Sequence, residues 1–367
     1  MQKQLTDRQT GLILIVSILA NKLLMLPGII CFEAKNNAYL VFLLSFLIDF
    51  LFVMIFLYIN QKIDMPIFKF LQNKFGKAVA VLFALPIIIT FAFKCVDIFG
   101  ECYLFFDQVM YVQVNQIIFM TCFLIMILYL GSRAYRTIGR SIELLFFVFV
   151  ISLFLSLYMS IGSANWSYLL PLNATMPTTI FQTMFNHNLW FGDFLALFLL
   201  VGNIKMEKNS KRRILIDYII GSCIVLLTVV IFICVFENTA SIHKMAIIDI
   251  TEYTPRLTSE GRLNWVIDLI FPIVNIIGLG IFANMGTKAL EFCLPKKISS
   301  NLIAVIFFAG MVFALAFFSN ISYPNLYLMI TKIGSYLSFI TQYIFPIILI
   351  ILCQKKELVY DKKVVIK

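Results

Sequence analysis

Residues 9–32 read QTGLILIVSILANKLLMLPGIICF, an apolar stretch of 24 residues with Asn21-Lys22 near its centre and Pro27-Gly28 just beyond. The stretch is long enough to cross a bilayer. Because a charge at the bilayer midplane is costly, Lys22 is a candidate functional residue. Polar and helix-breaking residues at mid-depth predict a discontinuous helix, which is how many transporters build a substrate site. The alternative is structural: Lys22 pairs with an acidic residue on a neighbouring helix and holds the bundle together.

The composition is that of a membrane protein. The chain of 367 residues is 61% hydrophobic and 13% charged, with a mean hydropathy of +0.96, whereas soluble domains are nearer half apolar and a quarter charged. We expect a single polytopic membrane domain over 1–367. No HExxH, GxSxG or GxxxxGK[ST] motif occurs, and the eight cysteines show no metal-ligand spacing. The sequence therefore predicts no enzyme, no cofactor and no metal site.

Hydropathy predicts an all-α protein with ten spans. Their approximate limits are 9–33, 37–59, 78–107, 113–130, 142–162, 178–203, 213–236, 263–287, 299–319 and 326–352. With both termini in the cytoplasm, 22 lysines and arginines are cytoplasmic, 4 are external and 3 lie inside spans. This asymmetry follows the positive-inside rule, so the net charge of +10 needs no nucleic-acid partner.

Ten spans divide into five and five, and two halves with an odd number of spans are inverted in the membrane. We expect one repeat over about 9–162 and another over about 178–352. The first helix of each half should then be broken at matching depth. Span six carries Phe191-Gly192-Asp193 near its middle, which predicts a second break opposite the one at Asn21-Lys22.

A broken helix exposes backbone N–H groups where it resumes, and these would satisfy the carboxylate of an amino acid. Its ammonium would take carbonyls of the unwound part of span six, or Asp193. Lys22 then has three possible roles: pairing with Asp193, adding positive charge near the substrate carboxylate, or replacing a sodium ion. Pairing ranks first, because an unpaired buried charge is the costliest option. The candidate ligand-binding residues are Ala20, Asn21, Lys22, Phe191, Gly192 and Asp193.

Span three carries Lys94, Asp97 and Glu101 on one helical face. We expect Lys94 and Asp97 to neutralise each other and Glu101 to remain. A structural stripe and an ion or proton path both fit this pattern. Asp49 and Lys332 are isolated charges within spans, and the sequence assigns them no partner.

Two loops stand out. Residues 65–75 have the pattern of a short amphipathic helix at the membrane surface. Residues 237–262 form the longest external loop, in which a short helix could cap an outward-facing pocket; a plain connector is the alternative.

Several short motifs, in this order, resemble a known family. They are Leu5-Thr6-Asp7-Arg8-Gln9, Leu26-Pro27-Gly28, Ile67-Phe68 through Phe75-Gly76-Lys77, Arg140-Ser141-Ile142-Glu143, Leu170-Pro171-Leu172 and Phe191-Gly192-Asp193. With the ten-span layout, the chain resembles the B subunit of endospore germination receptors, a branch of the amino acid–polyamine–organocation transporter superfamily. It departs from the family at Asn21-Lys22, where small residues are expected, and at Asp193, where glutamate is common.

The resemblance implies a LeuT-like fold with broken helices one and six, in the spore inner membrane. It also implies assembly with germination receptor A and C subunits, and binding of a small-molecule germinant, typically an amino acid. Two functions follow: a receptor that signals by conformational change, and an amino acid/cation symporter or proton-coupled permease. An ion channel is a third possibility, as a property of the whole assembly.

Overall fold

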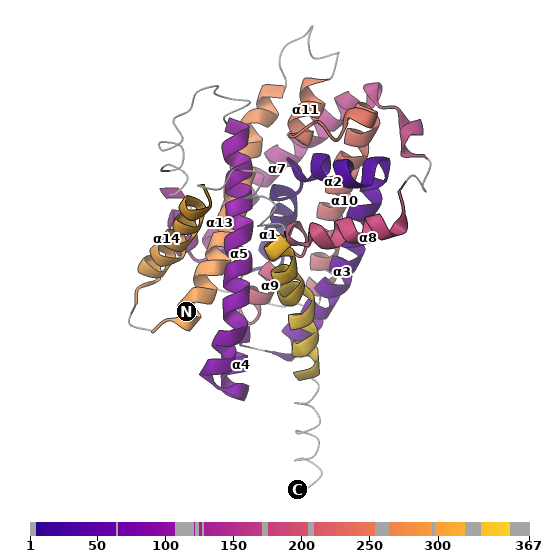
Figure 1. Ribbon diagram of the computed structural model, residues 1–367. Helices are drawn as coiled ribbons and strands as arrows, with labels where there is room; N and C mark the ends of the chain where they lie inside the picture. The colour runs from indigo at the N-terminus through magenta and orange to yellow at the C-terminus, as the bar shows by residue number, and fades with distance from the viewer. Residues whose placement is uncertain are drawn as a thin grey trace.

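A computed structural model shows an all-helical arrangement (Figure 1). It describes residues 5–63, 65–106, 121, 125–126, 128–170, 175–204, 209–253, 264–295, 298–319 and 332–352. Most of the predicted span 113–130 lies outside this part of the chain. Within these residues, six helical segments are long and apolar enough to cross a membrane: Leu26–Lys62, Lys77–Phe105, Tyr135–Ser163, Ser210–Thr239, Ile270–Cys293 and Lys332–Leu352.

The first span is broken where the sequence predicted. It consists of α1 (Asp7–Ala20) and α2 (Leu26–Ala34), separated by residues 21–25. Thr6 and Gln9 start α1 with reciprocal hydrogen bonds between side chain and backbone. Pro27 lies in the first turn of α2, where its missing N–H costs no helical hydrogen bond.

The sixth span is also broken. It contains α8 (Pro177–Asn186), the 3-10 turn η5 (Asn188–Trp190) and α9 (Leu195–Leu200). Gly192 has a φ of +69°, a left-handed conformation that glycine adopts at little cost. The two interrupted helices confirm the predicted breaks in spans one and six.

The remaining helices surround the two broken spans. They are α3 (Ala38–Lys62), α5 (Lys77–Phe105), α7 (Tyr135–Ser160), α10 (Ser210–Phe236), α13 (Asn264–Cys293), α14 (Ser300–Ser319) and the last helix, residues 332–352, with a π-turn at Ile340–Ile344. The prediction started the fifth span at 142, but α7 begins at Tyr135, because the polar stretch before 142 continues the helix.

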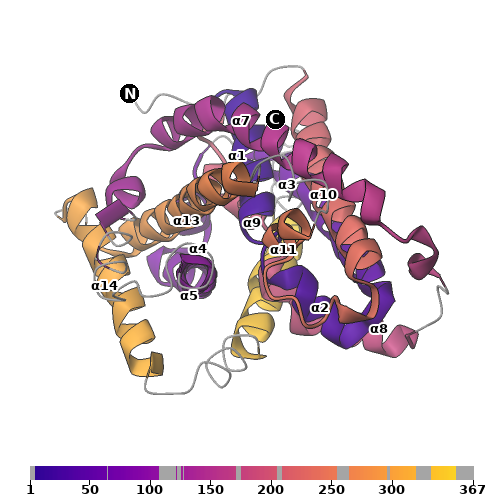
Figure 2. The same cartoon turned by 90° about the horizontal axis from the view of Figure 1, so that it is seen from above.

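Elements at corresponding positions of the two halves pack against one another. The third-span helix α5 packs on the eighth-span helix α13, and the second-span helix α3 packs on the seventh-span helix α10. In the view from above, α5 and α13 lie side by side, and α2 and α8 lie together (Figure 2). This pairing is what an internal two-fold relation between inverted halves requires. The boundaries 9–162 and 178–352 stay a prediction.

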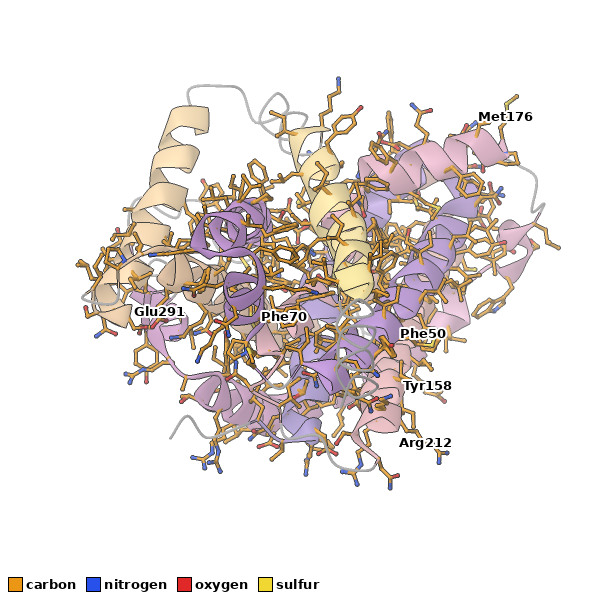
Figure 3. All side chains as sticks on the ribbon, turned by 90° about the horizontal axis from the view of Figure 1, so that it is seen from below. Phe50, Phe70, Tyr158, Met176, Arg212 and Glu291 are labelled. Atoms are coloured by element: carbon orange, nitrogen blue, oxygen red, sulfur yellow. The ribbon has the colours of Figure 1, made fainter. Side chains whose placement is uncertain are left out.

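Burial separates the centre of the bundle from its periphery. Every α1 residue except Arg8 is buried, whereas Leu144 and Tyr158 of α7 are about three-quarters exposed. Met176, just before α8, lies at the outer edge of the molecule (Figure 3). Apolar side chains on the outside suit a bundle whose solvent is lipid.

Both predicted loop helices are present. The helix α4 (Ile67–Phe75) buries Ile67, Phe68, Phe70 and Leu71 and leaves Lys69 exposed. The 237–262 loop contains the 3-10 turn η6 (Glu237–Thr239) and α11 (Ala246–Glu252). The structure describes this loop to residue 253, and α11 lies over the end of the bundle beside α2 (Figures 1 and 2).

We predict that Gly278→Ala destabilises the fold by about 1–3 kcal/mol, the usual cost of overpacking. A Cβ atom at Gly278 of α13 would lie 2.3 Å from the Cβ atom of Ala20, where α1 ends. Gly100→Ala in α5 is the matched control, because its Cβ would meet no atom within 4 Å. Melting temperatures of the detergent-purified variants provide the measurement. Equal melting temperatures would show that α13 does not fix the end of α1.

Candidate functional site

A buried aspartate between two lysines lies where the two breaks meet. The Lys22 ammonium contacts Oδ2 of Asp193, and Lys94 Nζ lies 2.7 Å from Oδ1 of the same carboxylate. The three side chains are at most 2% exposed. The predicted pairing of Lys22 with Asp193 is therefore present in the fold.

Lys94 differs from the expectation. We expected it to neutralise Asp97 within its own helix, but its ammonium donates to Asp193 and to the Phe191 carbonyl oxygen at 2.8 Å. Lys94 binds these two groups because the unwound part of span six presents both acceptors to α5. Asp97 instead faces the indole of Trp190, and Glu101 faces the backbone N–H of Met25 at the start of α2.

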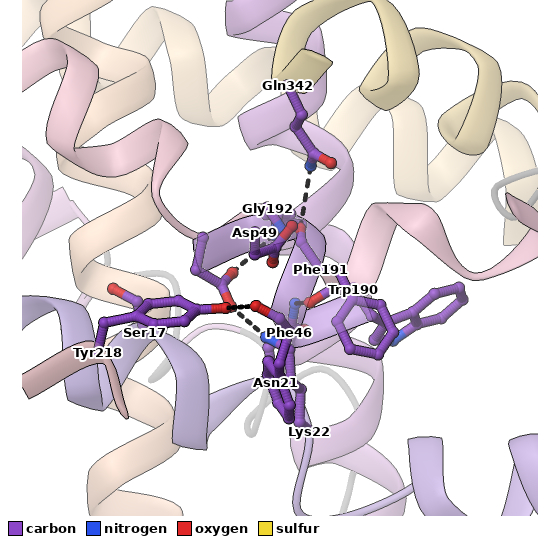
Figure 4. Close-up of polar contacts among 12 residues, drawn as sticks. Ser17, Asn21, Lys22, Phe46, Asp49, Trp190, Phe191, Gly192, Tyr218 and Gln342 are labelled. Carbon is purple, nitrogen blue, oxygen red and sulfur yellow. Dashed lines mark hydrogen bonds and ion pairs between the residues drawn. The ribbon is translucent and has the colours of Figure 1, made fainter. Parts of the chain in front are cut away.

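A second carboxylate completes the cluster. Asp49 of α3 accepts a hydrogen bond from the Gly192 N–H at 2.7 Å and another from the Tyr343 hydroxyl at 3.2 Å. Figure 4 shows Asp49 beside Gly192. With Lys22 and Lys94 as cations and Asp49 and Asp193 as anions, the four formal charges cancel. Paired charges are how a low-dielectric interior tolerates ionised groups.

Aromatic rings surround the lysines. The Lys22 ammonium lies 5.4 Å from the ring centroid of Phe191 and 5.9 Å from that of Phe46, and the Lys94 ammonium lies 5.2 Å from Phe282. A cation this close to an aromatic face is attracted by the ring quadrupole. The rings also exclude water, which strengthens the ion pairs.

Amide side chains hold the two breaks together. Asn21 Nδ2 donates to the Trp190 carbonyl oxygen at 3.2 Å, and Gln342 Nε2 donates to the Phe191 carbonyl oxygen at 3.0 Å (Figure 4). Gly192 leaves no room for a side chain, because a Cβ there would lie 2.1 Å from the Gln342 amide carbon. The left-handed turn at Gly192 therefore allows both Asp49 and Gln342 to reach the break.

Five of the six predicted ligand-binding residues belong to this cluster: Asn21, Lys22, Phe191, Gly192 and Asp193. Ala20 ends α1 against α13. Of the predicted ion-path residues, Lys94 joins the cluster, while Asp97 and Glu101 lie beside it toward α2.

The sequence reasoning missed Gln342 and Tyr343 and left Asp49 without a partner. One signal was available: Thr341-Gln342-Tyr343 is a polar run inside an apolar span. It lies in the π-turn of the last helix, a type of irregularity that is frequent at functional sites.

A hydrogen bond also joins α8 to α2. His187, at the end of α8, places Nε2 3.0 Å from the Glu33 carboxylate of α2. Within the described residues, no group of three or more His, Cys, Asp or Glu side chains could hold a metal ion.

Solved structures share this architecture at low sequence identity. A variant of the Eremococcus coleocola manganese transporter superposes with a TM-score of 0.59 at 10% identity, covering 91% of this chain and 76% of that one. A Na+-coupled sialic acid symporter, in a substrate-bound outward-open state, gives a TM-score of 0.60 at 12% identity, covering 91% of this chain and 78% of that one. These similarities establish the LeuT-like fold. No curated protein matches the sequence significantly.

The family is established by sequence. A family model described as "Spore germination protein" matches residues 4–320, which include both broken spans and every residue of the charge cluster except Gln342 and Tyr343. The chain therefore belongs to the spore germination protein family of membrane permeases.

Proposed function

We propose that this protein is the membrane-embedded, non-enzymatic nutrient receptor subunit of a spore germination receptor. A small germinant, typically an amino acid, binds where the two helix breaks meet, near the membrane midplane. Binding shifts the balance between conformations, and this shift is the signal. Family membership supports the role in germination, and the fold supports a ligand site at the breaks.

One observation carries the proposal: buried polar atoms without a partner inside the described chain gather around the breaks. They are Asn21 Oδ1, Glu101 Oε2, Asn188 Nδ2 and Gln342 Oε1. Buried polar atoms are normally hydrogen-bonded, so a group of exceptions requires an explanation. A polar ligand held between the breaks would supply the missing partners.

The ligand's ammonium is better placed near α5 than on Asp193. Both oxygens of Asp193 already bind lysines, so a ligand ammonium there would have to displace one of them. Asp97 and Glu101 lie one turn apart on α5 and face Trp190 and the start of α2. We therefore assign the ligand's ammonium to Asp97 and Glu101 instead of Asp193.

Lys22 supports a receptor that needs no sodium. Its ammonium lies at the crossing of the two breaks, bound by Asp193 and placed between Phe46 and Phe191. A tethered cation provides the positive charge that a bound ion would otherwise provide. Ligand binding would then proceed without a coupling ion.

The signal has to leave the membrane domain through partners. The family resemblance assigns that role to germination receptor A and C subunits at the spore inner membrane, with both termini of this chain in the cytoplasm. The excess of lysine and arginine in the predicted cytoplasmic segments over the predicted external loops supports this orientation.

The alternative is an amino acid/cation symporter or proton-coupled permease. Asp97 and Glu101 favour the proton-coupled version, because two neighbouring carboxylates, of which Glu101 is buried, can share and release a proton. In that case Lys94, Asp97 and Glu101 form the ion or proton path predicted for span three.

Removing one member of the cluster at a time tests whether its charges balance. Asp193→Asn leaves two buried ammoniums opposite Asp49 alone and should cost about 3–5 kcal/mol, as should Lys22→Met. The double variant Lys22→Met/Asp193→Asn leaves Lys94 opposite Asp49 and should recover at least half of the summed loss. Melting temperatures in detergent give the comparison.

The control for charge loss is Arg213→Gln. Arg213 pairs with Asp7 at 2.9 Å, but its side chain is 59% exposed, so we expect a cost below about 1 kcal/mol. If the two losses at Lys22 and Asp193 simply add in the double variant, the four charges do not balance one another.

Binding and accumulation of ligand in liposomes distinguish a receptor from a permease. Purified protein in liposomes, given a panel of labelled amino acids, should bind at least one saturably without accumulating it. Replacing sodium by N-methylglucamine should leave the affinity unchanged, because Lys22 already provides the cation. Glu101→Gln should weaken binding by about tenfold, through the loss of a charge-assisted hydrogen bond. Accumulation driven by a proton gradient and abolished by Glu101→Gln would establish the permease instead.

A further inference from the structure

A pocket of about 400 Å³ opens beside α2, on the face that the charge distribution predicts to be external. It lies between the outer half-helices of the two broken spans, the turn before α11 and the start of the last helix. In the view from above, α2, α8 and α11 lie together there (Figure 2). The ionisable lining residues are Glu33, His187, His243, Lys244 and Lys332.

This pocket is rich in lysine for the face on which it lies. Predicted external loops hold only four lysines and arginines, and Lys244 is one of them. Lys332 adds a second cation to the same pocket. Glu33 is bound by His187, and His243 lies 3.4 Å from Asp249. Within the described residues neither lysine meets a carboxylate, so the pocket carries an excess of positive charge.

The backbone around Lys244 is fixed on both sides. The His243 ring lies 3.8 Å from that of Phe236, and the Met245 N–H donates to Asp249 at 3.1 Å. Gly28 of α2 approaches the same turn so closely that a Cβ atom there would lie 2.1 Å from the His243 carbonyl oxygen. Lys244 is therefore presented at the pocket by a fixed turn.

His187 provides a second sign of a binding site. The side chain is 3% exposed and lines the pocket, and Nε2 is taken by Glu33. Its Nδ1 has no hydrogen-bond partner in the described chain. A buried polar atom without a partner in the wall of a pocket marks a position that a polar ligand group can fill.

We propose that this outer pocket binds the carboxylate group of a small molecule between Lys244 and Lys332. It is a site separate from the one proposed at the helix breaks. The ligand class follows from the two ammoniums, which have no carboxylate partner in the described part of the chain and can bind a carboxylate through strong charge-assisted hydrogen bonds. A volume of about 400 Å³ lies within the usual range for small-molecule sites.

The pocket is also connected to the first break. The Ala246 N–H, two residues after Lys244, donates to the carbonyl oxygen of Leu24 at 2.9 Å. Leu24 is one of the unwound residues between α1 and α2. A carboxylate held by Lys244 therefore acts on a turn that is hydrogen-bonded directly to the break.

The test compares propionate with propionamide, which differ only in the charged group. Saturation-transfer NMR on the full chain in detergent should show saturable binding of propionate and none of propionamide. The double variant Lys244→Gln/Lys332→Gln should raise the apparent Kd of propionate by at least about tenfold. Lys35→Gln is the matched control, because it removes an exposed cation on the same face outside the pocket.

A second variant separates charge from folding. Lys244→Arg/Lys332→Arg keeps both charges and should retain propionate binding, and melting temperatures verify that all variants fold. Equal saturation by propionate and propionamide would overturn the proposal, as would an equal loss in Lys35→Gln.

Discussion

The structure depends on the requirement that a charge inside a membrane protein be paired. Asp193 cannot remain ionised in the bundle without cations, and Lys22 and Lys94 provide them from two other helices. The negative charge of Asp49 balances the second lysine. Hydrogen bonds from Gly192 and Tyr343 hold the Asp49 carboxylate in place. One cluster thus joins both breaks to α3, α5 and the last helix. Because each partner comes from a different element, the arrangement of the helices and the balance of charge are a single constraint.

The breaks make this constraint useful. Unwinding two helices at the same depth releases backbone groups that must find partners, and polar side chains gather there to supply them. Asn21 and Gln342 use one amide atom each to tie the breaks and keep the other without a partner in the described chain. A site that is held together but not fully satisfied is suited to a ligand that completes it. This is the physical basis of the receptor function proposed here.

The outer pocket also combines polar groups that lack partners in the described chain with a link to a helix break. Its cations lie on a face with few of them, and its turn is hydrogen-bonded to Leu24 in the first break. The contact between Glu33 and His187 joins α2 to α8 beside it. A ligand in the outer pocket and a ligand at the breaks would therefore act on the same two helices, α2 and α8. A coupling between two such sites is reciprocal, since each ligand changes the affinity for the other by the same factor.

The sequence by itself determined the fold class, the two breaks and the candidate residues at them. Apolar runs and the lysine–arginine asymmetry are local or compositional signals, and Asn21-Lys22 and Phe191-Gly192-Asp193 interrupt such runs visibly. Only the tertiary structure decided which charges pair. Lys94 and Asp97 are close in sequence and share a helical face, yet Lys94 binds Asp193, because the unwound span six brings a carboxylate and a carbonyl to it together. The roles of Asp49, Gln342 and Tyr343 also depend on helices far apart in the chain, and so does the pocket that Lys244 and Lys332 share. Helix packing fixes such distances, and no local pattern encodes them.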